Sequence, residues 1–191
     1  MIHSSNYVHH DLHSGNILLS SSYFGYIADL GLCQQVNKSD DPDEIVGVIP
    51  YIAPEVFLKK PYTVRSDMYS FGMIMWGYTS GQKPFHDKSH DHHLICDILR
   101  GLRPEILEDT PEFYAELMKK CWDPDPEKRP TAETIINCLD NYYYQGIPEK
   151  YAKEIRFAES KRQELIKSEK YLTKNHPEAI YTSRSLKKIF Q

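Results

Sequence analysis

The chain has 191 residues, of which 40% are apolar and 26% are charged, a composition typical of a globular domain with a true core. The formal net charge of −4 argues against binding to nucleic acid or to a membrane surface, since both need a basic face. We expect no membrane span, because the longest apolar run, near Phe71 to Tyr78, is too short to cross a bilayer. We expect no secretory leader, because Met1 is not followed by a basic segment and an apolar stretch. The four scattered cysteines include no C-x-x-C pair, which favours reduced thiols in a cytoplasmic protein.

The first predicted elements are two short strands. The stretches "NILL" at 16–19 and "FGYIAD" at 24–29 predict a β-hairpin closed by the polar turn "SSSY". The sequence from 30 to 54 has little periodicity and contains the acidic run "SDDPDE" at 39–44. A segment of that length without regular structure is usually functional or mobile, so we expect a long loop there.

A buried helix is predicted next, over the stretch "SDMYSFGMIMWGYTSG". Ser66 is a good N-cap and Gly81 a good terminator, and the residues between them are apolar on nearly every side. The stretch "HDKSHDHH" at 86–93 has a spacing that fits no closed zinc site. We therefore expect a solvated polar loop that leads into a helix.

Two amphipathic helices are predicted further along the chain. The stretch "TPEFYAELMKKCW" at 110–122 begins with an N-cap threonine followed by proline, and its apolar side holds Phe113, Leu117 and Cys121. The stretch "TAETIINCLDNYYY" at 131–144 places one apolar stripe on a single side. That stripe consists of Ala132, Ile135, Ile136 and Leu139.

The composition changes after Gly146, where we place a boundary between residues 1–146 and a charged helical tail, residues 147–191. Residues 148–172 are rich in lysine and glutamate, with only a thin apolar seam. They predict an exposed, partly docked helix, which could alternatively bind a partner protein, although the seam is too thin for a stable coiled coil. The final stretch "HPEAIYTSRSLKKIF" at 176–190 predicts a short, loosely held tail.

Three motifs occur in a fixed order. Asp11 lies in "HHDLHSGN" with Asn16 five positions later, Asp29 lies in "ADLG", and "APE" at 53–55 closes the long loop. This set resembles the C-terminal lobe of protein kinases, whose signatures are H-R-D-L-x-x-x-N, D-F-G and A-P-E. The stretches "SDMYSFG", "GQKPF", "GLRPE" and "CWDPDPEKRP" continue the family's order and resemble its tyrosine-kinase-like branch. The resemblance covers residues 9–144.

The resemblance implies a fold and a set of ligands. The fold is expected to be mainly α with a small β-hairpin, an α+β arrangement like the large kinase lobe. Asp11 is expected to accept the proton of the attacking hydroxyl, and Leu18 to face the adenine of ATP. Asn16 and Asp29 supply the oxygen ligands that Mg²⁺ prefers. Each of these residues taken alone is more often a turn former or a helix cap, and the ordered set carries the prediction.

The resemblance also implies four supporting residues. His9 opens the motif that contains Asp11, and Asp67 is expected to accept hydrogen bonds from the backbone of that turn. Glu55 and Arg129 are expected to form a buried ion pair that holds the end of the long loop.

The sequence departs from the family pattern at several positions. His10 replaces the arginine before Asp11, and His13 stands where serine/threonine kinases carry lysine. Leu30 replaces the phenylalanine of D-F-G, and Val48 stands where serine/threonine enzymes have threonine. The 191 residues also contain no Gly-rich phosphate loop and no V-A-I-K stretch, so we expect the small lobe to be missing from this chain.

The sequence therefore predicts a protein kinase that transfers the ATP γ-phosphoryl group to a protein substrate, with serine or threonine favoured over tyrosine. The alternative hypothesis is a truncated or degenerate kinase that serves as a non-catalytic interaction module. The retained Asp11, Asn16 and Asp29 favour the enzyme, and the missing phosphate loop favours the module.

Overall fold

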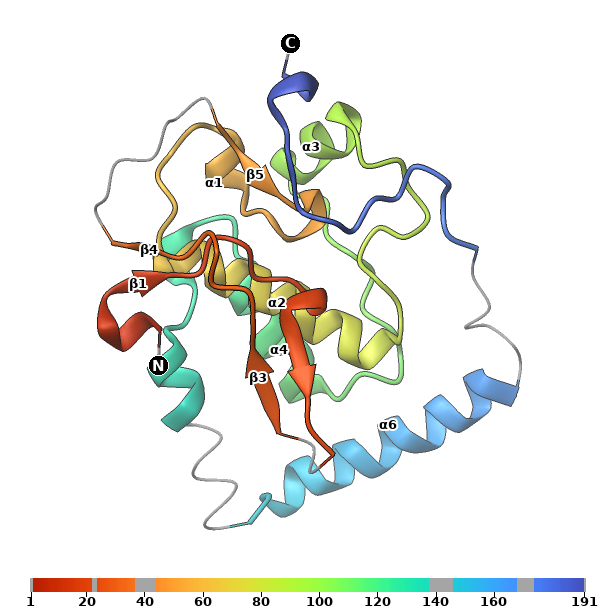
Figure 1. Ribbon diagram of the computed structural model, residues 1–191. Coiled ribbons are helices and arrows are strands. Elements are labelled where there is room, and N and C mark those ends of the chain that lie inside the picture. The colour runs from red at the N-terminus through yellow and green to blue at the C-terminus, as the bar shows by residue number, and fades with distance from the viewer. Residues whose placement is uncertain (1, 22–23, 37–43, 138–145, 168–173, 191) are drawn as a thin grey trace.

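The structure is a computed structural model that describes residues 2–21, 24–36, 44–137, 146–167 and 174–190 (Figure 1). The described residues are mainly helical, as predicted, with three small antiparallel sheets of two strands each. Most of the acidic run, Leu139, Cys138 and the end of the predicted 148–172 helix lie outside the described residues. None of the described helices is both long enough and apolar enough to cross a membrane.

The strands pair as follows. The predicted hairpin is formed by β2 (Ile17–Leu19) and β3 (Gly25–Ile27), with Leu18 opposite Tyr26. A second pair, β1 (Tyr7–Val8) with β4 (Gln34–Gln35), frames the segment that contains Asp11. The third pair joins distant parts of the chain, β5 (Val46–Gly47) with β6 (Arg184–Ser185).

The helices surround a core built on one central element. The α-helices are α1 (Pro54–Phe57), α2 (Val64–Ser80), α3 (His92–Leu99), α4 (Glu112–Cys121) and α6 (Glu149–Lys167), and residues 132–137 are also helical. Short 3₁₀ turns are η1 (His3–Ser5), η2 (Ser14–Asn16), η3 (Ile49–Tyr51), η4 (Pro126–Lys128) and η5 (Lys187–Ile189). Figure 1 shows α2 running through the middle of the molecule, with α6 along one edge.

The helix α2 is the predicted buried helix, but it begins earlier than expected. Its N-cap is Thr63, whose hydroxyl accepts a hydrogen bond from the Arg65 amide at 3.2 Å. Ser66 is the third helical residue, and its Oγ accepts from the Thr63 amide at 3.2 Å. This reciprocal capping box satisfies donors at both positions, which is why a cap-forming serine lies inside the helix. Gly81 ends the helix with φ +67°, as predicted.

Close contact between α2 and α4 depends on one glycine. A Cβ at Gly72 would lie 2.8 Å from the Cβ of Cys121, so only glycine allows the two helices this distance. The buried side of α4 consists of Ala115, Met118 and Cys121. Of the predicted stripe only Cys121 is buried, and Phe113 is half-buried because it packs on Tyr151 of α6, with 4.6 Å between ring centroids.

The buried thiol of Cys121 is expected to be unreactive in the folded protein. Burial raises the pKa of Cys121 to about 12, so only about one thiol in 10,000 is ionised at pH 8. Iodoacetamide at pH 8, followed by peptide mass spectrometry, should modify the exposed Cys96 and leave Cys121 unmodified until urea is added. Equal modification of both thiols without denaturant would contradict this packing.

The charged helix α6 is partly docked, as predicted. Glu154 accepts a hydrogen bond from the Phe113 amide at 3.1 Å, and this caps the start of α4. Ala158 is buried, whereas Ile155 in the same seam remains 37% exposed. The contact therefore involves one narrow stripe of α6, as its composition indicated.

The prediction of a loosely held C-terminal tail is wrong for residues 176–190. This segment returns across the molecule to β5 and lies beside α3 (Figure 1), and Leu186 is fully buried in the core. The prediction that 86–93 is a solvated loop is wrong at His86 and His90, which are buried. The His86 carbonyl accepts from the His176 amide at 2.7 Å, so the returning tail covers the loop.

Candidate functional site

Asp11 and Asn16 lie at the two ends of one compact turn between β1 and β2. The Asn16 side-chain Nδ2 donates to the Asp11 backbone carbonyl at 2.9 Å, and the 3₁₀ turn η2 brings the two residues together. Asp11 is 7% exposed and Asn16 is 8% exposed. Because the amide nitrogen makes this bond, the orientation of the amide oxygen is fixed and its lone pairs remain for another ligand.

The hairpin places Asp29 directly after the residue that pairs with Asn16. The Asn16 carbonyl accepts from the Ala28 amide at 2.8 Å, and Asp29 follows directly. Asp29 has φ +57°, and its Oδ1 accepts from the Gly31 amide at 3.2 Å, which shapes the turn after β3. The Asp29 side chain is exposed, and Leu18 on β2 is 56% exposed. The hydrogen bonds between Asn16 and Asp11 and between Ala28 and Asn16 therefore link the Asp11 turn to the hairpin that carries Leu18 and Asp29.

Two further side chains contact the Asp11 carboxylate. The Nε2 atom of His13 lies 3.6 Å from Asp11 Oδ2, and the hydroxyl of Ser183 donates a hydrogen bond to the same oxygen. Burial by itself would raise the pKa of Asp11, but the contacts with His13 and Ser183 lower it below the ordinary value of a carboxyl group. Asp11 is therefore ionised at neutral pH and can accept a proton.

Sequence reasoning noted His13 only as a departure from a pattern, and it missed Ser183 entirely. Ser183 lies 172 positions from Asp11, in a stretch whose local pattern resembles an unstructured tail. No periodicity or spacing joins the two residues. The signal of docking in that stretch is its apolar residues Tyr181, Leu186 and Ile189, which pack on the core, and it is weak because isolated apolar residues occur in many exposed segments.

The Asp67 side chain of α2 accepts the hydrogen bonds that hold the Asp11 turn. Its Oδ2 accepts from the His9 amide at 2.8 Å and from the His3 ring at 2.8 Å, and its Oδ1 accepts from the His10 amide at 3.2 Å. The His9 ring is buried and its Nε2 lies 3.1 Å from the Ala28 carbonyl, just before Asp29. Asp67 thus fixes the turn, and His9 links the turn to the hairpin.

Of the other departures from the family pattern, His10 and Val48 are explained by packing, and nothing in the described structure explains Leu30. The His10 ring stacks on Tyr62 with 4.4 Å between centroids, and its backbone adopts φ +69°. Val48 is buried in the core, whereas Leu30 is exposed beside the hairpin. None of these side chains displaces Asp11, Asn16 or Asp29.

Glu55 and Arg129 form a two-pronged buried ion pair. The Nη1 atom of Arg129 lies 2.7 Å from Glu55 Oε1, and Nη2 lies 2.8 Å from Oε2. Arg129 also donates to the backbone carbonyls of Arg65 and Asp123 at 2.9 and 2.8 Å. Its side chain is fully buried, so nearly every donor of the guanidinium is paired with a protein oxygen. Arg129 thereby joins Glu55, at the end of the long loop, to Arg65 of α2 and to Asp123, which lies between α4 and η4.

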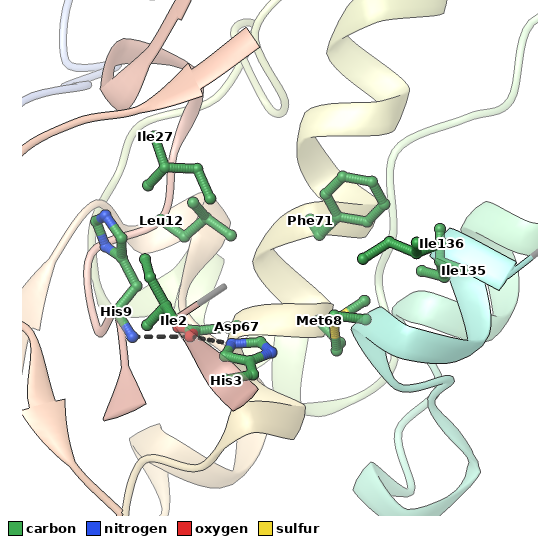
Figure 2. A pocket seen from close by; sticks show the side chains of 11 residues that line it. Ile2, His3, His9, Leu12, Ile27, Asp67, Met68, Phe71, Ile135 and Ile136 are labelled. Atoms are coloured by element: carbon green, nitrogen blue, oxygen red, sulfur yellow. Dashed lines mark hydrogen bonds and ion pairs between the residues drawn. The ribbon is translucent and has the colours of Figure 1, made fainter. Parts of the chain in front are cut away.

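An apolar pocket of about 270 Å³ lies on the other side of the turn. Figure 2 shows side chains of the turn, the hairpin, α2 and the 132–137 helix facing it, with the His9–Asp67–His3 contacts at its edge. Asp11, Asn16 and Asp29 do not line this pocket. The pocket is therefore separate from the cluster of oxygen-bearing side chains.

Comparison with known proteins shows which family has this order of motifs. The family model described as protein tyrosine and serine/threonine kinase matches residues 1–139. The chain is 34% identical over 158 residues to the dual specificity protein kinase shkA of Dictyostelium discoideum, covering 78% of this chain and 30% of that protein. It is 30% identical over 150 residues to the serine/threonine/tyrosine-protein kinase HT1 of Arabidopsis thaliana, covering 77% of this chain and 38% of that protein.

A third relative is the receptor-interacting serine/threonine-protein kinase 4 of Mus musculus, which is 35% identical over 142 residues, covering 68% of this chain and 18% of that protein. The chain thus spans well under half the length of each of these curated relatives. The matched region includes the Asp11 turn, the hairpin, the Glu55–Arg129 pair and α2. With its mainly helical lobe and this match over most of its length, the chain belongs to the protein tyrosine and serine/threonine kinase family.

Proposed function

We propose that residues 1–146 form the large lobe of a protein kinase that transfers the γ-phosphoryl group of ATP to a protein hydroxyl, with residues 147–191 as a charged tail. One observation supports this most strongly. A buried, ionised carboxylate at Asp11 is hydrogen-bonded through its backbone to Asn16, whose own backbone pairs with the residue before Asp29. Phosphoryl transfer needs a proton acceptor and metal-binding oxygens side by side, and this turn supplies both.

Each site residue has a proposed role. Asp11 accepts the proton of the attacking hydroxyl, and Leu18 provides an exposed apolar surface for the adenine. Asn16 and Asp29 would hold Mg²⁺, because an amide oxygen and a carboxylate are ligands that this ion prefers. The bound ion would neutralise charge on the phosphates. Serine or threonine is favoured as acceptor because the hydroxyl that contacts Asp11 in this chain belongs to a serine.

We also propose that residues 1–191 by themselves transfer phosphate slowly. The β- and γ-phosphates need a covering loop and a lysine, and neither motif occurs in the sequence. Positioning and electrostatics provide nearly all the catalysis in this reaction. Losing ~5 kcal/mol of transition-state stabilisation would lower turnover several thousand-fold from the usual range of about 1–100 per second.

The test measures radiolabelled phosphate transfer to a generic protein substrate. The purified 191-residue chain is expected to turn over several thousand-fold below that range. Fusion to the small lobe of a related kinase should restore transfer, and Asp11→Asn in the fusion should abolish it, because the amide cannot accept the proton.

Two results would contradict the proposal. Turnover by the 191-residue chain within tenfold of the usual range, lost in Asp11→Asn, would show that the covering loop is dispensable. A folded fusion that binds Mg·ATP but transfers no phosphate would instead favour the non-catalytic interaction module.

A further inference from the structure

The C-terminal segment lies against the Asp11 turn as an extended strand. Its strand β6 pairs antiparallel with β5, placing Arg184 opposite Gly47 and Ser185 opposite Val46. The Leu186 amide continues this pairing by donating to the Ile45 carbonyl at 2.8 Å. A segment from the far end of the chain thus adds a strand to the end of the long loop, which is a common way for extended peptides to bind.

The residue just before β6 places a hydroxyl at the proposed base. Ser183 donates a hydrogen bond to Asp11 Oδ2, and its Oγ lies 3.4 Å from His13 Nε2. An acceptor hydroxyl needs this relation to a general base, within hydrogen-bond reach of the group that takes its proton. The segment therefore presents a serine in the position of a reacting substrate.

Side chains on both sides of Ser183 are held by specific contacts. Leu186, three positions after the serine, is fully buried in the core. Arg184 donates from Nη2 to the His90 carbonyl at 2.8 Å. Tyr181, two positions before the serine, donates to the Pro84 carbonyl at 3.0 Å and lies under the Lys83 ammonium, 4.8 Å from its ring centroid. These contacts hold the segment through separate side chains before and after Ser183, on a surface that is called the groove from here on.

Gly47 explains how the strand can come so close to Asp11. Its φ of +145° belongs to a region that residues with a side chain rarely adopt. A Cβ there would lie 3.2 Å from Ile52 and 3.6 Å from Asp11 Oδ1. Glycine therefore leaves the floor of the groove open beside the carboxylate.

We propose that this groove is the substrate-peptide site of the lobe and that residues 176–190 are its resident occupant. The site recognises an extended peptide with serine at Asp11, arginine immediately after it and leucine three positions after it. This inference rests on the proposed role of Asp11 as the base. Because the occupant is tethered to the lobe, its effective concentration is on the order of millimolar, and a free substrate must displace it.

The occupant carries an acceptor hydroxyl at Ser183, so it can be phosphorylated as a substrate and does not act only as an inhibitor. Transfer from ATP would form a bond between Ser183 Oγ and the γ-phosphorus, break the bond from that phosphorus to the oxygen of ADP, and move the hydroxyl proton to Asp11. The product phosphoserine carries a charge of about −1.5 to −2 at neutral pH. Repulsion between this phosphate and Asp11 would release the segment and open the groove.

The experiment compares two charge substitutions in the full chain. Ser183→Asp places a carboxylate against Asp11, whereas Ser185→Asp adds the same charge on a nearby exposed residue of β6, whose hydroxyl contacts the Lys187 amide at 3.5 Å and not Asp11. Hydrogen exchange read by mass spectrometry should show residues 176–190 protected in the parent and in Ser185→Asp. In Ser183→Asp the exchange of this segment should rise at least tenfold, while α2 stays protected.

A second measurement determines the affinity of the vacated groove for a free peptide. A fluorescent peptide with the sequence of residues 176–190 should bind Ser183→Asp at least tenfold more tightly than it binds the parent or Ser185→Asp. Replacing Leu186 by alanine in the peptide alone should weaken binding at least tenfold, and this substitution cannot unfold the lobe. Alanine at Arg184 of the peptide should also weaken binding.

The outcomes separate this inference from the proposed activity, since neither measurement needs ATP or phosphate transfer. Equal exchange in Ser183→Asp and Ser185→Asp, or equal peptide affinity for the two, would overturn the docked segment. Equal affinity of the parent peptide and its Leu186→Ala form would overturn the recognition rule. A failed transfer assay with the expected exchange pattern would overturn the activity and leave the peptide groove standing.

Discussion

Arg129→Ala is expected to destabilise the lobe by roughly 3–5 kcal/mol, because it leaves Glu55 as a buried carboxylate without its charge partner. Within the described parts of the chain, the side chain of Glu55 then keeps a single hydrogen bond, from Ser66 at 3.2 Å. The substitution also removes the donors to the carbonyls of Arg65 and Asp123. Urea unfolding monitored by circular dichroism should therefore show a much lower midpoint with an unchanged slope.

Three variants separate the ion pair from general effects of substitution. Arg129→Lys should recover only part of the loss, since an ammonium cannot make the forked contact with both Glu55 oxygens. Removing both partners, in Arg129→Met with Glu55→Leu, should cost less than Arg129→Ala because no unpaired charge remains. Lys128→Ala is the matched control. Its exposed contact with Asp125 spans 3.9 Å, so its loss should change the unfolding free energy by less than about 0.5 kcal/mol.

The result that would contradict this assignment is equally specific. An Arg129→Ala chain whose unfolding free energy lies within 1 kcal/mol of the parent, measured by the same method, would show that the pair does not hold the lobe together. A double variant no more stable than Arg129→Ala would show that lost packing, and not the unpaired Glu55 charge, causes the effect.

Asp67→Ala is expected to cost roughly 2–6 kcal/mol of stability and to loosen the Asp11 turn. The substitution leaves the buried His9 amide and the half-buried His10 amide without their acceptor, and each unsatisfied donor costs about 1–3 kcal/mol. The His10 backbone adds to this, because its φ of +69° is unfavourable for a residue with a side chain and is held by the bond to Asp67. Thermal unfolding should report the loss of stability, and amide exchange at His9 and His10 should report the loosened turn.

His3→Ala provides the control for Asp67. The His3 ring contacts the same carboxylate at 2.8 Å, but its side chain is partly exposed and its removal leaves both backbone bonds intact. The expected loss is about 1 kcal/mol, as for a single hydrogen bond. If His3→Ala and Asp67→Ala were equally destabilising, the backbone contacts would not be what anchors the turn.

The sequence alone was enough to predict the elements whose patterns are local. The hairpin, the buried helix α2 and the order of Asp11, Asn16 and Asp29 follow from stretches of a few residues, because turn chemistry and apolar periodicity act over short distances. The kinase family was also predictable, since several short motifs occur together in one order. Even the error at the start of α2 was local, because Ser66 and Thr63 are both good caps and only their mutual bonds decide between them.

What only the tertiary structure decided is the place of residues 176–190. Their stretch of polar residues, one proline and a few apolar side chains has no periodicity, so local reasoning assigned them to a loose tail. Leu186 is buried because the core offers it a space, and Ser183 reaches Asp11 because β6 pairs with a strand about 138 residues earlier in the chain. The same C-terminal segment contacts His86 and His90, which are buried although their polar stretch predicted a solvated loop. Long-range pairing of this kind depends on the shape of the surface already formed by the rest of the lobe, and no short stretch of sequence contains that information.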